Sequence, residues 1–295
     1  MGEPAPFRRP TADEADLASV YARVKNDFRA AGLATPDLDA RVLVTETLGV
    51  STAQLVANPR RPVPADLASL LAKRVAARLD GQSIGRILSR RAFWSLDLRV
   101  GPATLEPRPE TETVVELALK MFEGHAPPAT IADLGVGTGA ILLALLTEHP
   151  TSTGLGVDVS FEALEEARRN AERTGLAGRV HLVRSDFGAA LGDTFDLVVS
   201  NPPYIESSVI AGLEKTVRDF DPPLALDGGP DGLCCYRKVF GEAPQLLSPR
   251  GRLVVEINPD AVDAVVAEAE RCGLCVMAMA DDLAGRARAI AFCTG

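Results

Sequence analysis

The sequence predicts an α/β protein, with a doubly wound sheet of seven strands and alternating helices preceded by a small all-α domain. Three features support this prediction: a change of hydrophobic pattern near residue 85, a glycine turn between a strand and a helix, and an Asn-Pro-Pro-Tyr stretch that ends an apolar strand. The length of 295 residues agrees with two domains, because one domain usually has about 100–200 residues.

Residues 1–85 have the pattern of a small helical bundle, and we interpret them as an N-terminal domain. Apolar residues at steps of three and four predict helices over residues 11–31, 35–48, 51–57 and 64–79. Thr11 and Thr35 are candidate N-caps, and Gly49 and Gly81 stand where a left-handed residue commonly ends a helix. A bundle of this kind predicts packing or partner docking and no chemistry of its own.

Residues 86–107 alternate partly between apolar and polar side chains, which predicts a β-hairpin linker. The only tryptophan, Trp94, lies in this hairpin, where we expect it to anchor the two domains to each other; the alternative is a contact with the substrate. A helix is predicted to begin near Pro109, since proline suits the first helical position and acidic residues follow it. Capping does not account for Arg108, a charge held between two prolines where the domain of residues 108–295 begins.

The strongest local pattern is a strand, a glycine turn, a helix and a second strand. Residues 130–134 form a short apolar strand, residues 135–139 have the spacing Gly-x-Gly-x-Gly, and a helix follows from Ala140. Glycines let the backbone approach a ligand closely at a helix N-terminus, and this spacing differs from the Gly-x-Gly-x-x-Gly of dinucleotide-binding proteins. The second strand ends at Asp158, where a carboxylate can hold the hydroxyls of a ribose.

An Asn-Pro-Pro-Tyr stretch ends the apolar strand of residues 196–200. Its two prolines remove two N–H donors and stiffen the backbone, so the carbonyls of Asn201 and Pro202 are expected to face outward as acceptors. With the Asn201 carboxamide and the Tyr204 ring, these acceptors suit a planar group that carries an NH2. The alternative is a proline-rich turn that only ends a core strand.

The remaining strands complete a sheet of seven. The strand of residues 179–184 leads to Asp186 and Phe187, which suit the amino group and the face of an adenine, although Asp186 could instead only cap a turn. Apolar stretches then predict strands near residues 252–257, 274–279 and 287–293, and helices over residues 160–174, 233–247 and 260–272. Ligands of doubly wound sheets bind outside the carboxyl ends of the strands.

Composition argues against several classes of protein. No apolar run approaches the roughly 18 residues that cross a membrane, and the first ten residues have no apolar signal core, so we expect a soluble, cytoplasmic protein. Five cysteines are expected to be free thiols, and with only three scattered histidines we predict no metal site. The formal charge of −9 disfavours a nucleic acid as the main partner.

The motifs together resemble one family over nearly the whole chain: the HemK/PrmC peptide chain release factor glutamine methyltransferases, which are class I S-adenosylmethionine-dependent enzymes. The matching stretches are the Phe93-Trp94 hairpin, Glu106-Pro-Arg-Pro-Glu-Thr-Glu112, Asp133-Leu-Gly-Val-Gly-Thr-Gly139, Ser200-Asn-Pro-Pro-Tyr204, Leu226-Asp-Gly-Gly-Pro-Asp-Gly232 and Asp282-Leu-Ala-Gly-Arg286. Many amino-methylating enzymes share the glycine turn and the Asn-Pro-Pro-Tyr stretch, whereas Pro-Arg-Pro-Glu-Thr-Glu with a helical N-terminal domain is close to specific. Residues 81–84 lack the proline usual before the hairpin, and Phe187 stands where some members have Trp.

The resemblance implies a Rossmann-like methyltransferase sheet, with S-adenosylmethionine as cofactor and S-adenosylhomocysteine as product. It implies methylation of the side-chain amide nitrogen of a glutamine in the GGQ motif of release factors, which would modulate translation termination. The residues implied to bind the cofactor are Gly135, Val136, Gly137, Thr138, Gly139, Asp158, Asp186, Phe187 and Asn201. Those implied to bind the substrate are Asn201, Pro202, Pro203, Tyr204 and Arg108, with Asn201, Pro202 and Tyr204 carrying the chemistry.

Two other functions remain open from the residues. A DNA or RNA amino-methyltransferase would present an adenine or guanine NH2 to the same four residues, although the acidic charge disfavours it. A cofactor-binding scaffold without catalysis would need a damaged motif, and every motif is intact.

The charge is divided unevenly, which bears on how a partner protein would dock. Residues 1–90 contain 13 Lys and Arg against 10 Asp and Glu, a net +3, whereas the remainder contains 18 against 30, a net −12. If a release factor is the substrate, we expect residues 1–85 to dock it, with contacts from Arg60, Arg61, Lys73 and Arg74. The alternative is that these are solvated charges on a bundle that only supports the fold.

Overall fold

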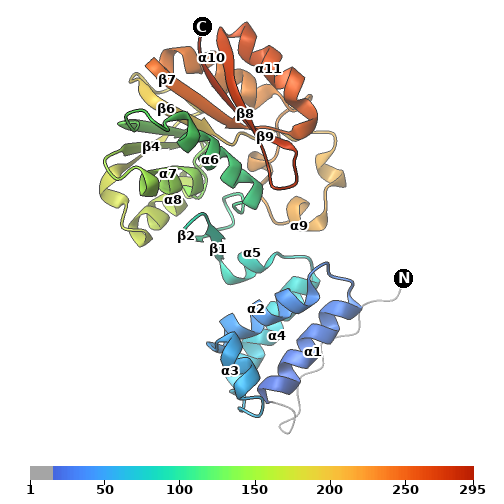
Figure 1. The fold of residues 1–295 in the computed structure, drawn as a ribbon. Coiled ribbons are helices and arrows are strands. Elements are labelled where there is room, and N and C mark those ends of the chain that lie inside the picture. The colour runs from blue at the N-terminus through green and yellow to red at the C-terminus, as the bar shows by residue number, and fades with distance from the viewer. Residues whose placement is uncertain (1–15) are drawn as a thin grey trace. The chain divides into compact units, whose positions relative to one another are not determined.

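The structure is a computed structural model that describes residues 16–295, and it consists of two compact units that divide between Ser89 and Arg90 (Figure 1). The first unit is helical, with α1 (Leu17–Ala30), α2 (Pro36–Leu48), α3 (Thr52–Ala57), α4 (Ala65–Leu79) and α5 (Ile84–Leu88). The four predicted helices are present, and α5 was not predicted because five residues are too few to show a helical period.

Two capping predictions have different outcomes. Thr11 lies outside the described residues, and α1 begins after Asp16, whose side chain accepts a hydrogen bond from the backbone N–H of Ser19. Thr35 precedes α2 as predicted, but its hydroxyl donates to Asp39 Oδ1 at 2.8 Å, so its side chain caps no backbone N–H. Pro36 begins this helix instead, because its ring presets a helical φ and it has no N–H to satisfy.

The second unit is α/β. Its strands are β1 (Arg90–Phe93), β2 (Leu96–Arg99), β3 (Thr130–Leu134), β4 (Thr153–Asp158), β5 (Val180–Arg184), β6 (Phe195–Ser200), β7 (Leu247–Glu256), β8 (Leu274–Asp281) and β9 (Ala287–Thr294). Its α-helices are α6 (Glu112–Met121), α7 (Ala140–Glu148), α8 (Phe161–Arg173), α9 (Lys215–Arg218), α10 (Cys234–Leu246) and α11 (Val262–Arg271). The predicted doubly wound sheet of seven strands is confirmed.

The sheet has the strand order β5-β4-β3-β6-β7-β9-β8. Strands β3 to β7 are parallel to one another, whereas β9 is antiparallel to both β7 and β8. From β3 the chain proceeds outward through β4 to β5, then returns to β6 on the other side of β3 and proceeds to β7. The direction therefore reverses between β3 and β6, and ligands of open α/β sheets bind at the carboxyl ends of the strands at such a point.

Each face of the sheet is covered by its own apolar core. Ile131, Leu197 and Val199 face a core shared with α6, α7 and α8, whereas Ala132 and Val198 face a core shared with α10 and α11. Adjacent residues of a strand point to opposite faces, so strands buried on both sides become continuous apolar runs. This double burial holds the carboxyl ends of β3 and β6 in place.

The predicted hairpin is present as β1 and β2, and it belongs to the α/β unit. Trp94, at its tip, packs against the core of that unit and donates from Nε1 to Glu148 Oε1 at 2.7 Å. Its backbone N–H donates to Glu112 Oε1, also at 2.7 Å. The contacts of Trp94 thus anchor the hairpin to the α/β unit.

The cysteines and the lengths of the helices bear on the class of protein. The five cysteines are free thiols. Within residues 16–295 there is no helix with the length and apolarity that crossing a membrane requires.

Candidate active site

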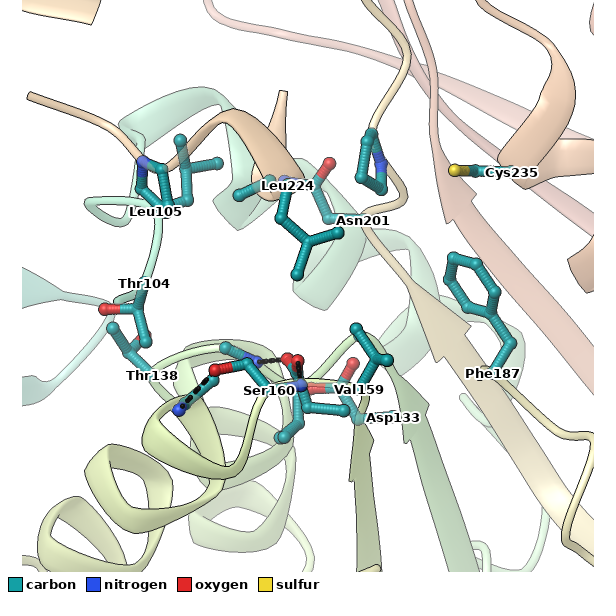
Figure 2. A pocket seen from close by; sticks show the side chains of 18 of the residues that line it. Thr104, Leu105, Asp133, Thr138, Val159, Ser160, Phe187, Asn201, Leu224 and Cys235 are labelled. Carbon is teal, nitrogen blue, oxygen red and sulfur yellow. Dashed lines mark hydrogen bonds between the residues drawn. The ribbon is translucent and has the colours of Figure 1, made fainter. Parts of the chain in front are cut away.

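A cavity of about 770 Å³ opens at the carboxyl ends of β3, β4 and β6, at the reversal point of the sheet. Figure 2 shows Leu105, Leu224 and Asn201 on one side of the cavity and Thr138 and Ser160 on the opposite side. Its volume falls in the range of about 300–1,000 Å³ that is usual for small-molecule sites. The cavity is lined by segments that lie far apart in the sequence.

The glycine turn after β3 forms one wall of the cavity. Gly135, Gly137 and Gly139 all have left-handed φ values, of 85°, 51° and 83°, which residues with a Cβ rarely adopt. The backbone N–H groups of Gly135 and Val136 both donate to the carbonyl of Val157 on β4, each at 2.8 Å. The first four residues of the turn, 135–138, line the cavity, whereas Gly139 lies behind them as the N-cap of α7.

Asp158 ends β4 and lines the same cavity. Its Oδ2 accepts from the N–H of Gly137 at 3.0 Å, and its Oδ1 accepts from the N–H of Ser160 at 2.9 Å. Burial raises the pKa of its carboxyl above the usual range, and these backbone hydrogen bonds oppose the shift. Asp158 therefore ties the glycine turn to the start of α8 and presents a carboxylate to the cavity.

Asp133, on β3, is a second acid on the cavity wall, and no role was predicted for it from the sequence. Its side chain is 1% exposed, and its Oδ2 accepts from the N–H of Leu142 at 3.2 Å. Its Oδ1 has no hydrogen-bond partner within the described part of the chain. Burial raises the pKa of Asp133 to about 7. The buried, unpartnered oxygen suits a cationic group of a ligand.

Asn201 follows β6, and its carboxamide lies on the cavity wall. The strand end is held by Ser200, a buried residue whose hydroxyl donates to the carbonyl of Leu134 at 2.5 Å. The Asn201 Nδ2 donates to Thr111 Oγ1 at 3.3 Å. This contact uses one of the two N–H groups of the carboxamide, and the Asn201 Oδ1 is the acceptor of the same side chain.

The other three residues of the Asn-Pro-Pro-Tyr stretch differ in position. Pro203 lines the cavity, whereas Pro202 and Tyr204 are not among its lining residues. The Tyr204 ring packs against the core beside α10, and its hydroxyl donates to Glu256 Oε1 at 3.4 Å. Burial raises the pKa of Tyr204, so its phenol stays protonated. Stacking of the Tyr204 ring on a substrate and acceptance of a substrate N–H by the Pro202 carbonyl therefore both stay predictions.

The predicted adenine-binding residues follow β5, and both line the cavity. Phe187 has a left-handed φ of 48°, and its ring faces the cavity in Figure 2. The Asp186 carboxylate is half exposed and pairs with Lys238 Nζ at 2.6 Å. Lys238 itself lines the cavity, so the pair forms its polar edge.

The Arg108 guanidinium also lines the cavity, and it pairs with the buried carboxylate of Asp221 at 2.6 Å. This ion pair joins the loop before α6 to the long loop after β6. A role of Arg108 in binding substrate stays a prediction. Across residues 16–295, no cluster of His, Cys, Asp and Glu is arranged to hold a metal ion.

Comparison with known proteins gives the family. The PrmC N-terminal domain family matches residues 19–88, and the methyltransferase small domain family matches residues 113–217. The release factor glutamine methyltransferase of Caulobacter vibrioides is 40% identical over 93% of this chain and 95% of that protein. The enzyme of the same name from Agrobacterium fabrum is 39% identical over 95% of this chain and 98% of that protein.

The chain belongs to the release factor glutamine methyltransferase family. The predicted resemblance is therefore confirmed, and so is the expectation of an enzyme. Among solved structures, a methyltransferase from Pyrococcus furiosus matches 75% of this chain and 98% of its own, with a TM-score of 0.50 and 22% identity. The hMettl16 catalytic domain, solved with an RNA hairpin, matches 76% of this chain and 81% of its own, with a TM-score of 0.55 and 15% identity. The similarity to these two structures shows that this chain shares their fold.

Three residues with contacts at the site, Thr111, Glu112 and Asp133, were given no role from the sequence. Within the Pro-Arg-Pro-Glu-Thr-Glu stretch, Arg108 holds Asp221, Thr111 holds Asn201, and Glu112 holds the hairpin. Asp133 could have been found from the sequence, because it is an acid in an apolar strand directly before the glycine turn. The contact between Thr111 and Asn201 could not, because 90 residues separate them.

Proposed function

We propose that this chain transfers a methyl group from S-adenosylmethionine to the side-chain amide nitrogen of a glutamine in a peptide chain release factor. Family membership supports this activity and this substrate. The observation that carries the proposal is the Asn201 carboxamide, which lies on the wall of the same cavity as the glycine turn. A cofactor and a planar amide would thus meet at the reversal point of the sheet.

The residues of the cavity fit the proposed cofactor. The unpartnered Asp133 Oδ1 suits the ammonium of its amino acid part, and Asp158 suits the hydroxyls of its ribose. Phe187 and the edge formed by Asp186 suit the face and the amino group of its adenine. The open backbone of Gly135 and Gly137 leaves room for the methionine chain between these groups.

The chain acts mainly by positioning. Bound S-adenosylmethionine supplies a methyl group on a positively charged sulfur. The glutamine nitrogen is a weak nucleophile, because its lone pair is delocalised into the carbonyl. In the proposed mechanism, Asn201 Oδ1 and the Pro202 carbonyl accept hydrogen bonds from the two N–H groups of the amide. These hydrogen bonds stabilise charge as it develops on the nitrogen.

The proposed reaction needs no strong base. A nitrogen–carbon bond forms as the sulfur–carbon bond breaks, and the nitrogen becomes acidic as it gains the methyl group. One N–H proton is then lost to water, and S-adenosylhomocysteine and the methylated glutamine are the products. Because release factors act on the ribosome, we place this reaction in the cytoplasm, and the five free cysteines agree with a reducing compartment.

Methyl transfer from labelled cofactor tests this proposal directly. We expect label to enter purified release factor and not total RNA, because residues 91–295 carry 30 Asp and Glu against 18 Lys and Arg. Label in RNA and none in release factor would overturn the assignment. The nucleic acid alternative is not favoured, since the likeness to the hMettl16 domain, at 15% identity, shows only the fold.

A further inference from the structure

One face of the α10 helix lies against the turn that follows β5. Lys238, Glu242 and Leu246 follow one another at steps of four residues, so they share this face. Gly188, in the turn, shows how close the two segments are. A Cβ added to it would lie 2.5 Å from Leu246 Cδ1 and 2.9 Å from Glu242 Oε2. The turn is therefore in contact with the side chains of this helix face.

Two hydrogen bonds join the helix to the turn. Glu242 Oε2 accepts from the backbone N–H of Gly188 at 2.7 Å, and Lys238 Nζ donates to Asp186 Oδ2 at 2.6 Å. The two bonded residues of the turn stand on either side of Phe187, which has a left-handed φ of 48°. A residue other than glycine keeps such a φ only where its surroundings impose it. The α10 helix supplies two of these constraints.

We infer that Lys238 and Glu242 are positioning residues that hold this turn in the shape in which Asp186 and Phe187 receive the adenine of the cofactor. The inference rests on the part of the proposed function that places S-adenosylmethionine in the cavity. Asp186, Phe187 and Lys238 line the cavity, whereas Glu242 is not among its lining residues. Glu242 therefore acts on a ligand only through the turn.

The ion pair leaves Asp186 able to bind a ligand. A carboxylate has about four acceptor sites on its two oxygens, and Lys238 contacts Oδ2, so an amino group such as that of adenine can donate to the same carboxylate. The side chains of Lys238 and Asp186 are 51% and 53% exposed, so their ion pair contributes little to the stability of the free protein. Its effect is expected in binding, because a carboxylate that is already ordered loses less conformational freedom when a ligand binds.

Binding of S-adenosylhomocysteine, measured by calorimetry, tests the role of Lys238. Lys238→Met removes the charge and should raise the Kd about fivefold, the effect of leaving one side chain unordered, with an unchanged midpoint of urea unfolding. Lys238→Arg should restore the Kd. Arg237→Met is the matched control, because Arg237 is the preceding residue of α10, forms ion pairs at the surface and is not a lining residue of the cavity. It should keep the wild-type Kd.

A double variant shows whether Lys238 acts through Asp186. If it does, Lys238→Met should cost nothing further in an Asp186→Ala background, because the side chain that it orders is already absent. Equal fivefold losses in both backgrounds would overturn the inference, since the Lys238 ammonium would then act on the ligand without Asp186.

The role of Glu242 is tested by a conservative replacement. Glu242→Ala removes the acceptor of the Gly188 N–H and should raise the Kd for S-adenosylhomocysteine about fivefold. Glu242→Gln keeps an oxygen that can accept the same hydrogen bond, so it should bind like the wild type. An equal loss in Glu242→Gln would overturn the role given to this hydrogen bond.

The same titrations separate the inference from the proposed function. A wild-type Kd in both Lys238→Met and Glu242→Ala would overturn the inference and leave the proposed function standing. A wild-type protein that does not bind S-adenosylhomocysteine would overturn both. If the Kd values follow the predicted pattern but release factor is not methylated, the inference is supported and only the proposed substrate is wrong.

Discussion

Replacing Asp133 with Asn should make the free protein more stable and its cofactor binding weaker. Asn has the same shape and can keep the hydrogen bond from the Leu142 N–H, so the change removes mainly the ability to ionise. In the wild type the carboxyl is buried, one of its oxygens has no partner in the described chain, and its pKa is raised to about 7. Ionising this group in the folded protein therefore costs free energy.

The magnitude follows from the difference between the folded and unfolded pKa values. The folded value of about 7 lies above the ordinary 3.8, so the folded state holds a proton that the unfolded state has lost. Stability must then fall as pH rises from about 4 to about 7. For these two values, the contribution of Asp133 falls by about 2 kcal/mol between about pH 5.5 and about pH 8.

Urea unfolding at the two pH values measures this effect. Because Glu256 has a raised pKa too, the wild type alone is not informative, and the quantity to compare is the stability of Asp133→Asn minus that of the wild type. This difference should grow in favour of the variant by about 2 kcal/mol toward the higher pH. Calorimetry should show cofactor binding weakened by about tenfold or more, since a charge-assisted hydrogen bond is lost. A constant stability difference together with normal cofactor affinity would refute the role given to Asp133.

Three further predictions concern the substrate side of the site. Asn201→Ala should lower kcat by about 10²–10³, the effect of one preorganised polar group, with a normal cofactor Kd by calorimetry; a parallel loss of cofactor binding would contradict its substrate role. Arg60→Glu with Arg61→Glu should raise KM for intact release factor by about tenfold and leave a short glutamine peptide unaffected, whereas equal effects on both substrates would argue against docking. In Gly228→Ala the added Cβ would lie 2.7 Å from the Tyr204 Cα, so kcat should fall by at least about tenfold in steady-state assays, and unchanged kcat would show that this backbone contact is unimportant.

Most of the fold was predictable because it depends on local signals. Continuous apolar runs predicted the central strands, and glycines with left-handed φ, such as Gly49 and Gly139, stand where predicted helices end or begin. The α5 helix has too few residues for a periodic signal. Trp94 was expected between the domains, and nothing in its own neighbourhood indicated that its ring would lie on the core of the α/β unit.

The site was predictable only in part, because only some of its residues follow local sequence signals. The glycine turn, Asp158 and Asn201 follow strands whose carboxyl ends meet at one edge of the sheet, so a pattern of strands was enough to bring them together. The contact that supports Asn201 comes from Thr111 on another element, and it depends on burial and on the distance between the two side chains. Neither quantity can be read from a sequence without the fold.

Of the four charged residues expected to dock a partner, three are exposed in the structure: Arg60, Arg61 and Lys73. Arg74 is half-buried and donates to Thr47 Oγ1 at 2.8 Å, so part of its hydrogen-bonding capacity is used inside the helical unit. The docking role of this unit stays a prediction, and Arg60 and Arg61 are its best test.

The central claim is that the side-chain amide of a glutamine is methylated at the Asn201 site. The most direct measurement is peptide mapping by mass spectrometry of release factor incubated with cofactor and either the wild type or Asn201→Ala. The account predicts one added methyl group, on a glutamine side chain, with the wild type and almost none with the variant. A methyl group on another residue type, or equal methylation by both proteins, would contradict it.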